Sequence, residues 1–279
     1  MPILEHEVAV RDLLSKSNLP TVDYVINPYV GCPHGCKYCY ASFMKRFTGH
    51  TEDWGTFIDV KRCSKPINLK KLEGKSVFLS SVTDCYNAYE ETYRCTRAVL
   101  EQLVQADAYV SISTKSDLIL RDLDLLRQFR HLTVALSVNT LDENFRRDMD
   151  SASPVADRLR ALRTLRENGI GTVLFMSPIF PYITDCRGII DCSREYIGEY
   201  WFENLNLRGA YRPVILEYVR THYPQYEEQY RRIYCEGDGY YWRALADKLN
   251  AYCSANGIRY KNYFHHSALV QRKKEGNPV

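Results

Sequence analysis

The sequence predicts an α/β fold in which a parallel sheet is flanked by helices. Six short apolar segments with strand character alternate with segments of helical periodicity. Parallel neighbours need crossover connections, and the intervening helices supply them. The 279 residues, 45% hydrophobic and 25% charged, suit one large domain or one domain with a small extension. The expected strands are residues 23–29, 76–83, 108–114, 131–139, 170–180 and 199–207.

The remaining elements follow from turn and capping residues. Residues 1–20 are expected to be a polar lead-in, and residues 49–70 an irregular connection between the first helix and the second strand. Gly49 closes that first helix, Pro154 stands in the first turn of a later one, and Gly169 caps its end. Helices are expected over residues 37–47, 90–105, 118–129 and 186–197, and in two stretches between the fourth and fifth strands.

Three parts of the chain are expected: a lead-in over residues 1–20, a core over 21–210, and a helical C-terminal extension over 211–279 with a polar tail. No strand candidate appears in the extension before residues 257–264. The tail from residue 271 is polar and basic, and we expect it to be frayed.

The bulk composition excludes several classes of protein. A net charge of +3 is too small to indicate a nucleic-acid-binding protein by itself. No apolar run approaches the roughly 20 residues that cross a bilayer, and the first residues lack the apolar region of a secretion signal. Ten cysteines without such a signal suit metal ligation in a reducing cytosol better than disulfides, so we expect a cytoplasmic protein.

The most informative stretch runs from residue 27 to residue 47 and contains Cys32, Cys36 and Cys39 in a C-x3-C-x2-C spacing. A four-iron cluster takes one thiolate per iron when all its corners are occupied by protein. Three cysteines therefore leave one iron open for an exogenous ligand. Small and turn-forming residues between the cysteines allow the three sulfurs to converge.

Two other interpretations of these cysteines remain open from spacing alone. A zinc ion could use the same cysteines with His34 as its fourth ligand, although structural zinc sites usually combine two paired elements that lie far apart in sequence. The cysteines could also be inert core residues, since free cysteine is often buried.

The motif resembles the C-x3-C-x-aromatic-C signature of the radical S-adenosylmethionine (radical SAM) superfamily. The wider pattern NPY-x-GC-x-H-x-C-x-YCYA is similar to the branch that includes spore photoproduct lyase. Within that branch, the run ASFMKRFTGH and the later SVTD resemble a subgroup called radical SAM mobile pair protein B.

This resemblance implies a partial (β/α)6 TIM-like barrel, open on one side, with a [4Fe-4S] cluster and S-adenosylmethionine as cofactors. The open iron would chelate the methionine part of S-adenosylmethionine. Reductive cleavage would then release a 5′-deoxyadenosyl radical that abstracts hydrogen from a substrate. The resemblance also implies a flavodoxin-like or ferredoxin-like electron donor, and the subgroup's name suggests a second radical SAM protein as partner.

In such barrels the site lies at the C-terminal ends of the strands. Ser81, Thr83 and Asp84 lie at the end of the second expected strand, where the superfamily binds the methionine amino group. Lys115 follows the third strand and is expected to bind the methionine carboxylate as a cation. An ordinary strand-to-helix turn, or a solvated lysine, would use the same residue types.

Further ligand candidates follow the later strands. Ser137 and Asn139 close the fourth strand and match a serine near the ribose in the related lyase, although a satisfied buried serine is an alternative. Phe175, Met176 and Pro178 at the end of the fifth strand could form an apolar wall for adenine.

The motif aromatic Tyr38 is expected beside the same cofactor. Arg146 and Arg147 are weaker candidates, because arginines on helices are usually solvated. Four polar residues at the end of the last expected strand indicate either a substrate-facing edge or a capping turn: Glu203, Asn204, Asn206 and Arg208.

The chain departs from spore photoproduct lyase at one informative position. The cysteine that returns a hydrogen atom in that lyase aligns with Val82, which makes thymine-dimer repair an unlikely activity. Cys85 lies three residues further on and is a candidate catalytic hydrogen donor, a redox thiol or an incidental buried cysteine. The cysteines outside the motif form no C-x2-C pair, so a second cluster has little support.

Two functions are therefore carried forward. The first is a radical SAM enzyme with an unknown substrate. The second is a non-catalytic iron–sulfur or zinc module that binds nucleic acid, using a tyrosine stripe of the C-terminal extension (Tyr223, Tyr226, Tyr230 and Tyr234) to stack bases. Such a stripe is more often packing, and the sequence does not identify a substrate.

Overall fold

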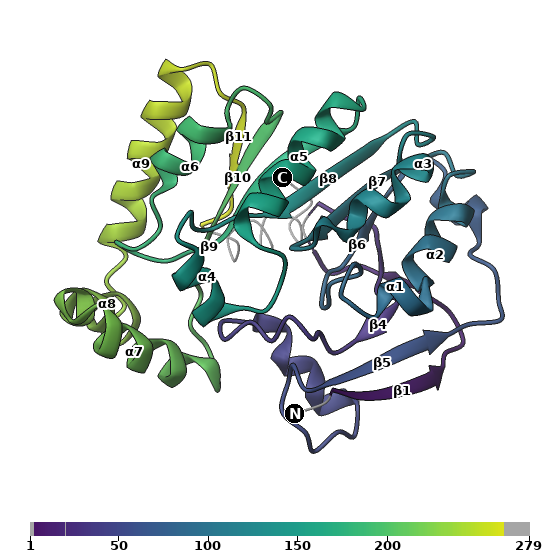
Figure 1. Ribbon diagram of the computed structural model, residues 1–279, viewed down its shortest axis with the longest axis horizontal. Helices are drawn as coiled ribbons and strands as arrows, with labels where there is room; N and C mark the ends of the chain where they lie inside the picture. The colour runs from purple at the N-terminus through teal and green to yellow at the C-terminus, as the bar shows by residue number, and fades with distance from the viewer. Residues whose placement is uncertain (1–2, 20, 265–279) are drawn as a thin grey trace.

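The computed structural model describes residues 3–19 and 21–264. Its centre is an eight-stranded sheet with the order β11-β10-β9-β8-β7-β6-β3-β2 (Figure 1). In this sheet β3 and β6 to β11 are all parallel to one another, and β2 runs antiparallel to β3 at one edge. Within the described residues the two edge strands do not pair with each other, so the sheet is an open, partial barrel.

The element bounds follow the chain in order. The strands are β1 (Leu4–Ala9), β2 (Leu14–Lys16), β3 (Tyr24–Ile26), β4 (Tyr29–Val30), β5 (Phe57–Arg62), β6 (Lys75–Leu79), β7 (Ala108–Thr114), β8 (Leu132–Ser137), β9 (Gly171–Ile179), β10 (Glu199–Asn204) and β11 (Tyr260–Asn262). The α-helices are α1 (Glu90–Tyr93), α2 (Cys95–Leu103), α3 (Leu123–Leu126), α4 (Glu143–Met149), α5 (Val155–Glu167), α6 (Cys186–Ser193), α7 (Tyr211–His222), α8 (Glu227–Tyr234) and α9 (Tyr240–Ala255). Short 3-10 helices are η1 (Tyr40–Phe47), η2 (Leu69–Leu72), η3 (Asp117–Asp122) and η4 (Pro224–Tyr226).

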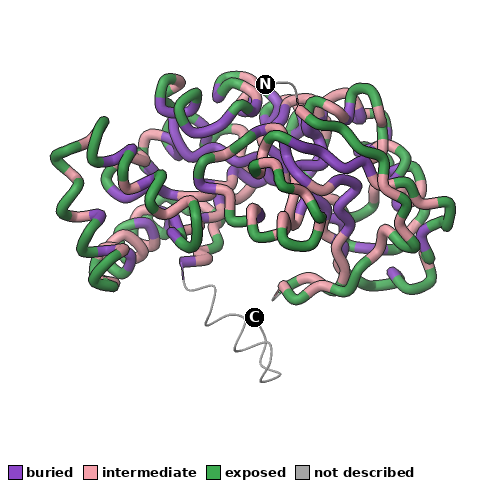
Figure 2. Tube along the Cα trace, turned by 90° about the horizontal axis from the view of Figure 1, so that it is seen from below, coloured by how far each residue is buried: buried purple, intermediate pink, exposed green. Residues whose placement is uncertain are grey.

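The main hydrophobic core lies between the outer face of this sheet and the helices. Alternate strand residues such as Val134, Leu136 and Leu174 are buried against helix residues such as Leu162 and Leu165. Figure 2 shows the buried trace running through the centre with exposed segments around it. Because strand side chains alternate between faces, the residues between these positions point to the inner face of the barrel.

The predicted α/β fold is confirmed. The six expected strands correspond to β3 and β6–β10, which are neighbours in the sheet in sequence order, and β7 has the predicted bounds of 108–114. The helix expected over residues 37–47 is shorter, because the cysteine loop extends to Cys39 and η1 begins at Tyr40.

A second, three-stranded sheet was not predicted. It has the order β1-β5-β4 and lies beside the barrel, at the lower right of Figure 1. The prediction of an irregular connection over residues 49–70 was wrong, because β5 occupies its middle and pairs on both sides. Phe57 to Val60 are all buried, so the period-two pattern that identifies a half-exposed strand is missing. Two strands, β1 and β2, also lie in the stretch expected to be a lead-in.

The C-terminal extension contains α7, η4, α8 and α9, and its strand β11 joins the main sheet beside β10. Its tyrosine stripe serves packing: Tyr230 is 1% exposed, the Tyr234 hydroxyl donates to the Leu205 carbonyl at 3.0 Å, and Tyr226 stacks on Tyr182. This removes the support for base stacking by the stripe. The polar tail expected from residue 271 lies outside the described residues. Within the described ranges, no helix is long and apolar enough to cross a membrane.

Candidate active site

The cysteine loop lies where the sequence places it, at the C-terminal end of β3. Strands β6 to β10 end on the same side because they are parallel to β3. The loop is held by backbone hydrogen bonds to the segment after α4: Lys37 N–H donates to Met149 O at 2.9 Å, and Ser151 N–H donates to His34 O at 2.8 Å. The loop is therefore anchored at two points to one segment that lies more than 100 residues away in the sequence.

Two glycines allow the loop to lie against the small sheet. Gly31 has a φ of +84°, and a Cβ on this residue would lie 2.3 Å from the Phe57 carbonyl oxygen. Gly55 has a φ of +100°, and a Cβ there would lie 2.9 Å from the Gly35 Cα. Only glycine combines a left-handed backbone with such close approach. Strand β5 and the loop before it thus form the back wall of the cysteine loop.

All three motif cysteines are free thiols, and each is largely screened from solvent. Burial raises the pKa of Cys36 to about 12, with the Lys115 ammonium opposing the effect, and burial likewise raises the pKa of Cys39. Burial, the Asp84 carboxylate and the two other thiols raise the pKa of Cys32 as well. The nearby Trp54 side chain and backbone N–H groups oppose this rise in the pKa of Cys39. Such thiols ionise when a bound metal supplies positive charge.

The donor set fits an iron–sulfur cluster better than a single metal ion. A tetrahedral zinc ion with bonds of about 2.3 Å to sulfur would bring its ligands within about 3.8 Å of one another. Within the described residues, the three thiols do not gather within 4.8 Å, although each is close enough to affect the others' ionisation. A cubane cluster spreads its thiolates over its corners and accommodates this wider triangle. His34, the alternative fourth zinc ligand, instead faces Asp84.

Lys115 directly follows β7 and faces this loop. Its Nζ lies 5.7 Å from the centre of the Tyr38 ring, and its charge acts on Cys36, Cys39 and Asp150. Among the residues that the structure describes, Lys115 forms no ion pair with a carboxylate. A half-buried ammonium beside the cysteines without a carboxylate partner is available to an anionic ligand.

Asp84 connects the second expected strand to the third and to the cysteine loop. Its carboxylate accepts hydrogen bonds from Thr114 Oγ1 at 2.7 Å, Lys115 N–H at 2.8 Å and Tyr86 N–H at 2.9 Å. His34 Nε2 lies 3.1 Å from Asp84 Oδ2. Burial opposes ionisation, but His34 and these donors outweigh it and lower the pKa of Asp84 to about 2. Most acceptor positions of this carboxylate are therefore already occupied.

Ser81 and Thr83 form a hydrogen-bonded seam with the cysteine loop. Thr83 Oγ1 donates to Gly31 O at 2.6 Å, and the Asn27 side chain donates to Ser81 Oγ at 2.9 Å. The Tyr40 hydroxyl donates to the Ser81 carbonyl. This role of Asn27 was not predicted from the sequence, although Asn27 directly follows β3 and a polar residue at a strand end could have indicated it.

Tyr38 is fixed by a buried ion pair that the sequence did not reveal. Its hydroxyl donates to Asp150 Oδ2 at 2.9 Å, and Arg158 Nη2 lies 2.8 Å from Asp150 Oδ1. Both charged side chains are 1% exposed. Arg158 also donates to the carbonyl of Ser137 at 3.1 Å. Burial opposes ionisation of Asp150, but Arg158 and Lys115 hold its pKa below the usual value.

Ser137 and Asn139 lie at the end of β8, as predicted. Ser137 is 5% exposed, and its hydroxyl has no hydrogen-bond partner among the described residues. Asn139 Nδ2 donates to the Pro178 carbonyl at 3.2 Å, so this side chain joins the ends of β8 and β9. The serine therefore remains open to a ligand, whereas the asparagine has a structural partner.

The three residues of the expected apolar wall do not share one face. Phe175 pairs in register with Ser137 and with Trp201, which places all three on the inner face. The next residue, Met176, is fully buried on the outer face, in the core against the helices. Tyr263 packs against Phe175 and Trp201 and extends the aromatic surface. Two inner-face aromatics, Trp201 and Tyr263, were missed by the sequence analysis.

Several of the other candidate residues are accounted for by structural contacts. Arg146 donates to the carbonyls of Asp150 and Ala152, both at 3.1 Å. Arg147 bonds Asn144 on its own helix. The Ser177 hydroxyl donates to Glu203. Cys85 is fully buried in the hydrophobic core, and burial raises the pKa of its thiol well above the usual value. These surroundings are those of an incidental buried cysteine.

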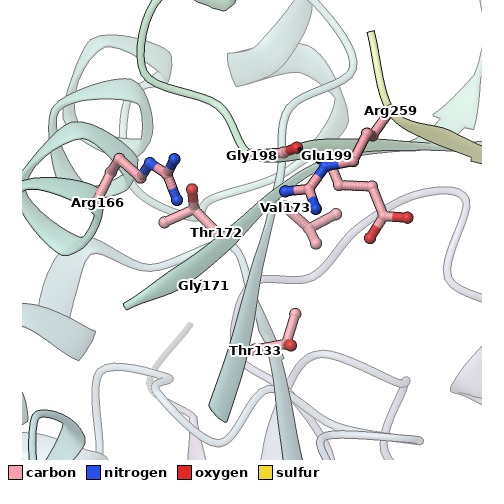
Figure 3. Close-up of a pocket in the computed structure, with 8 residues that line it drawn as sticks. All are labelled: Thr133, Arg166, Gly171, Thr172, Val173, Gly198, Glu199 and Arg259. Atoms are coloured by element: carbon pink, nitrogen blue, oxygen red, sulfur yellow. Dashed lines mark hydrogen bonds between the residues drawn. The ribbon is translucent and has the colours of Figure 1, made fainter. Parts of the chain in front are cut away.

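A separate crevice of about 200 Å³ lies at the opposite end of the barrel. Figure 3 shows its lining from the beginnings of β8, β9 and β10, with the side chains of Arg166 and Arg259 on either side. Because catalytic groups of such barrels lie at the C-terminal ends of the strands, this crevice is not part of the candidate site.

Comparison with known proteins agrees with this geometry. The family model described as "Radical SAM superfamily" matches residues 26–189, more than half of the chain. The chain is 36% identical over 221 residues to an uncharacterized protein of Methanocaldococcus jannaschii, a match that covers 78% of this chain and 83% of that relative.

Solved structures with the same fold include two whose titles name S-adenosylmethionine. A spore photoproduct lyase variant with bound AdoMet and dinucleoside spore photoproduct has a TM-score of 0.58 and 18% identity, and SuiB of Streptococcus suis bound to S-adenosylmethionine has a TM-score of 0.55 and 16% identity. The matches cover 79% and 85% of this chain. The chain spans 66% of the lyase chain and 49% of SuiB, and at these identities the likeness concerns the fold alone.

Proposed function

The chain belongs to the radical SAM superfamily, whose members use a [4Fe-4S] cluster and S-adenosylmethionine, and we propose that it cleaves S-adenosylmethionine reductively to abstract hydrogen from a substrate. Cys32, Cys36 and Cys39 would hold the cluster. When bound, the cluster supplies the electron that breaks the sulfonium–C5′ bond. The residues around it bind and orient the cosubstrate and shield the reaction from water.

One observation carries the proposal most strongly: the half-buried Lys115 ammonium beside the cysteine thiols. Because it forms no ion pair with a carboxylate in the described part of the chain, it can neutralise the methionine carboxylate of S-adenosylmethionine. A charge-assisted contact of this kind is stronger than a neutral hydrogen bond. Lys115 is therefore the residue that distinguishes a cosubstrate-binding site from a bare cluster site.

The remaining contacts divide between binding and positioning. The open hydroxyl of Ser137 and the inner-face ring of Phe175 would contact the adenosine part. Ser81 and Thr83 retain oxygen lone pairs for the methionine amino group. Asp84, Asn139 and Tyr38 have hydrogen-bond partners within the protein, which supports a role in positioning the loop and strand ends. We leave Met176 and Cys85 out of the site because both belong to the core.

The first test measures 5′-deoxyadenosine. The reconstituted wild-type chain, reduced anaerobically with S-adenosylmethionine, should form it, and Cys36→Ala should abolish the product. Cys63→Ala is the matched control, because this free cysteine lies outside the loop in the β5–η2 connection. A wild-type chain that binds about four irons yet never cleaves the cosubstrate would contradict the proposal and leave the non-catalytic iron–sulfur module as the interpretation.

The substrate class stays open. Enzymes of this superfamily need an electron donor, and we propose a flavodoxin-like or ferredoxin-like protein in the cytoplasm. A second radical SAM protein as partner, and membership of the mobile pair protein B subgroup, remain predictions from the motifs. Cleavage of S-adenosylmethionine without added substrate would still establish the reaction type.

A further inference from the structure

A second group of metal-ligating side chains lies in the small sheet, outside the cysteine site. His6 belongs to β1, Asp59 belongs to β5, and His50 lies in the loop between η1 and β5. Their potential ligand atoms all lie within 4.8 Å of one another, and they form the only such group of three or more within the described residues. The ASFMKRFTGH run, whose last residue is His50, has no other role in the proposed reaction.

We propose that His6, His50 and Asp59 bind one divalent transition-metal ion of the zinc or ferrous class. Asp59 Oδ1 lies 2.9 Å from His50 Nε2 and 3.8 Å from His6 Nδ1. A tetrahedral ion with bonds of about 2.0 Å to nitrogen and oxygen separates its ligand atoms by about 3.3 Å, between these two distances. Two imidazoles and one carboxylate are a donor set that such ions accept.

The surroundings of His50 match those of a metal-bound imidazole. Its other nitrogen, Nδ1, lies 3.1 Å from Glu52 Oε2, so this carboxylate orients the ring and would accept the Nδ1 proton while Nε2 binds the ion. The centre of the His50 ring lies 3.9 Å from that of the Phe57 ring and 5.3 Å from that of the His6 ring, with an interplanar angle of 12° to His6. The side chains of His50 and Asp59 are both 7% exposed, whereas His6 is half exposed and gives access from solvent.

The proposed metal ion would replace the proton between His50 and Asp59. Without metal, a hydrogen shared between His50 Nε2 and Asp59 Oδ1 holds the two side chains together. The ion takes its place, and the proton leaves to solvent with no change in oxidation state. The bound ion would tie β1, β5 and the loop at His50 together. Because His50 stacks on Phe57, whose carbonyl lies against Gly31, the tie would stiffen the wall behind the cysteine loop.

The test separates this ion from metal bound by the cysteines. In the full chain carrying Cys32→Ala, Cys36→Ala and Cys39→Ala, one equivalent of Co(II) should bind with weak visible bands and no thiolate charge-transfer band. His50→Asn and Asp59→Asn should abolish this binding. Glu52→Ala should weaken it about 10- to 100-fold, as is usual for carboxylates that orient metal-bound histidines.

Two further measurements guard against misfolding and against adventitious metal. His6→Ala alters a half-exposed side chain, so it should keep the wild-type circular dichroism spectrum while losing Co(II) affinity about tenfold or more. Zn(II) should raise the Tm of the cluster-loaded wild-type chain but not that of His50→Asn. His222→Ala, on α7, is the control and should bind like wild type. The proposal would be overturned if the chain bound no stoichiometric ion, or if His6→Ala and Asp59→Asn bound Co(II) as tightly as their parent chain. Neither result would bear on S-adenosylmethionine cleavage.

Discussion

Lys115 is the residue that best distinguishes a cosubstrate-binding site from an ordinary turn at the end of a strand. A solvated lysine would contribute little, whereas this ammonium lies over the Tyr38 ring and acts on two motif thiols. Asp84 shows the opposite case at the neighbouring strand. Its position predicts a ligand, but its carboxylate already accepts three hydrogen bonds from the protein and faces His34. Strand-end position alone does not distinguish these two roles.

Lys115→Ala is expected to weaken S-adenosylmethionine binding by about tenfold or more, because one charge-assisted contact contributes about 1.5–3 kcal/mol. Iron content should stay at the wild-type level, since Lys115 is not a ligand. Equilibrium binding to the reconstituted chain measures the affinity, and Lys248→Ala on α9 serves as the lysine control. Unchanged affinity would remove Lys115 from the site.

The depressed pKa of Asp84 predicts how the metal-free chain responds to acid. Its folded pKa of about 2 lies below the ordinary value of 3.8, so the folded state binds fewer protons than the unfolded state. This contribution to stability is complete above the unfolded pKa and is lost as pH falls towards 2. Between about pH 5.5 and about pH 3, wild type should lose about 1 kcal/mol more unfolding free energy than Asp84→Asn. Parallel pH profiles of the two chains in urea would contradict the assignment.

Cys85→Ala tests whether this cysteine is part of the core or a hydrogen donor. The side chain is fully buried, so its truncation should lower the free energy of unfolding by about 1–2 kcal/mol. Formation of 5′-deoxyadenosine should be preserved. If the variant keeps its Tm but loses product formation, the thiol has a catalytic role after all.

Contacts from the surrounding elements hold the cysteine loop in a defined position. The loop has little regular structure of its own, and it is positioned by β5 behind it, by the loop after β6, and by the segment after α4. The buried Arg158–Asp150 pair connects α5 to Tyr38 in the same way. Each contact joins residues far apart in sequence, and together they determine where the three thiols point.

Gly31→Ala should reduce iron incorporation because its Cβ would lie 2.3 Å from the Phe57 carbonyl oxygen, in addition to the cost of a left-handed backbone. Gly49→Ala is the matched control: its φ is +79°, but no atom lies within 4 Å of the added Cβ. Iron and sulfide per chain should therefore fall for the Gly31 variant and stay near wild type for the Gly49 variant. Equal losses in both would show that backbone strain, not close packing, controls the loop.

At the scale of the whole molecule, the C-terminal extension adds β11 as the last strand at one edge of the open barrel. Strand β11 pairs with β10 over Tyr200, Trp201 and Phe202, and it carries Tyr263 to the inner face just beyond its end. The extension is thus part of the main sheet and of the aromatic surface near the site.

A pair of truncations tests the contribution of β11. A chain that ends at residue 256 should unfold at a lower temperature than one that ends at residue 264, because β10 becomes an unpaired sheet edge. It should also aggregate more readily. Thermal unfolding and light scattering on the two metal-free chains provide the comparison. Equal Tm values would mean that β11 contributes little to the fold.

The sequence by itself determined the alternation of strands and helices, the C-x3-C-x2-C spacing of the three motif cysteines and the strand ends on which polar residues gather. These features depend on local periodicity and spacing, which are visible in a single chain. The sequence did not reveal β5 as a strand, because its first four residues are all buried and leave no alternating pattern. Which of Phe175 and Met176 points to the inner face of the barrel likewise became clear only from the strand register.

Only the tertiary structure decided which polar groups are occupied and which are open. Asp84 and Tyr38 have buried partners, whereas Lys115 forms no ion pair with a carboxylate within the described residues and Ser137 keeps an open hydroxyl there. The grouping of His6, His50 and Asp59 also depends on the pairing of β1 with β5. The physical reason is the same in each case: hydrogen bonds and ion pairs form between groups that are close in space, and spacing along the chain does not encode that distance.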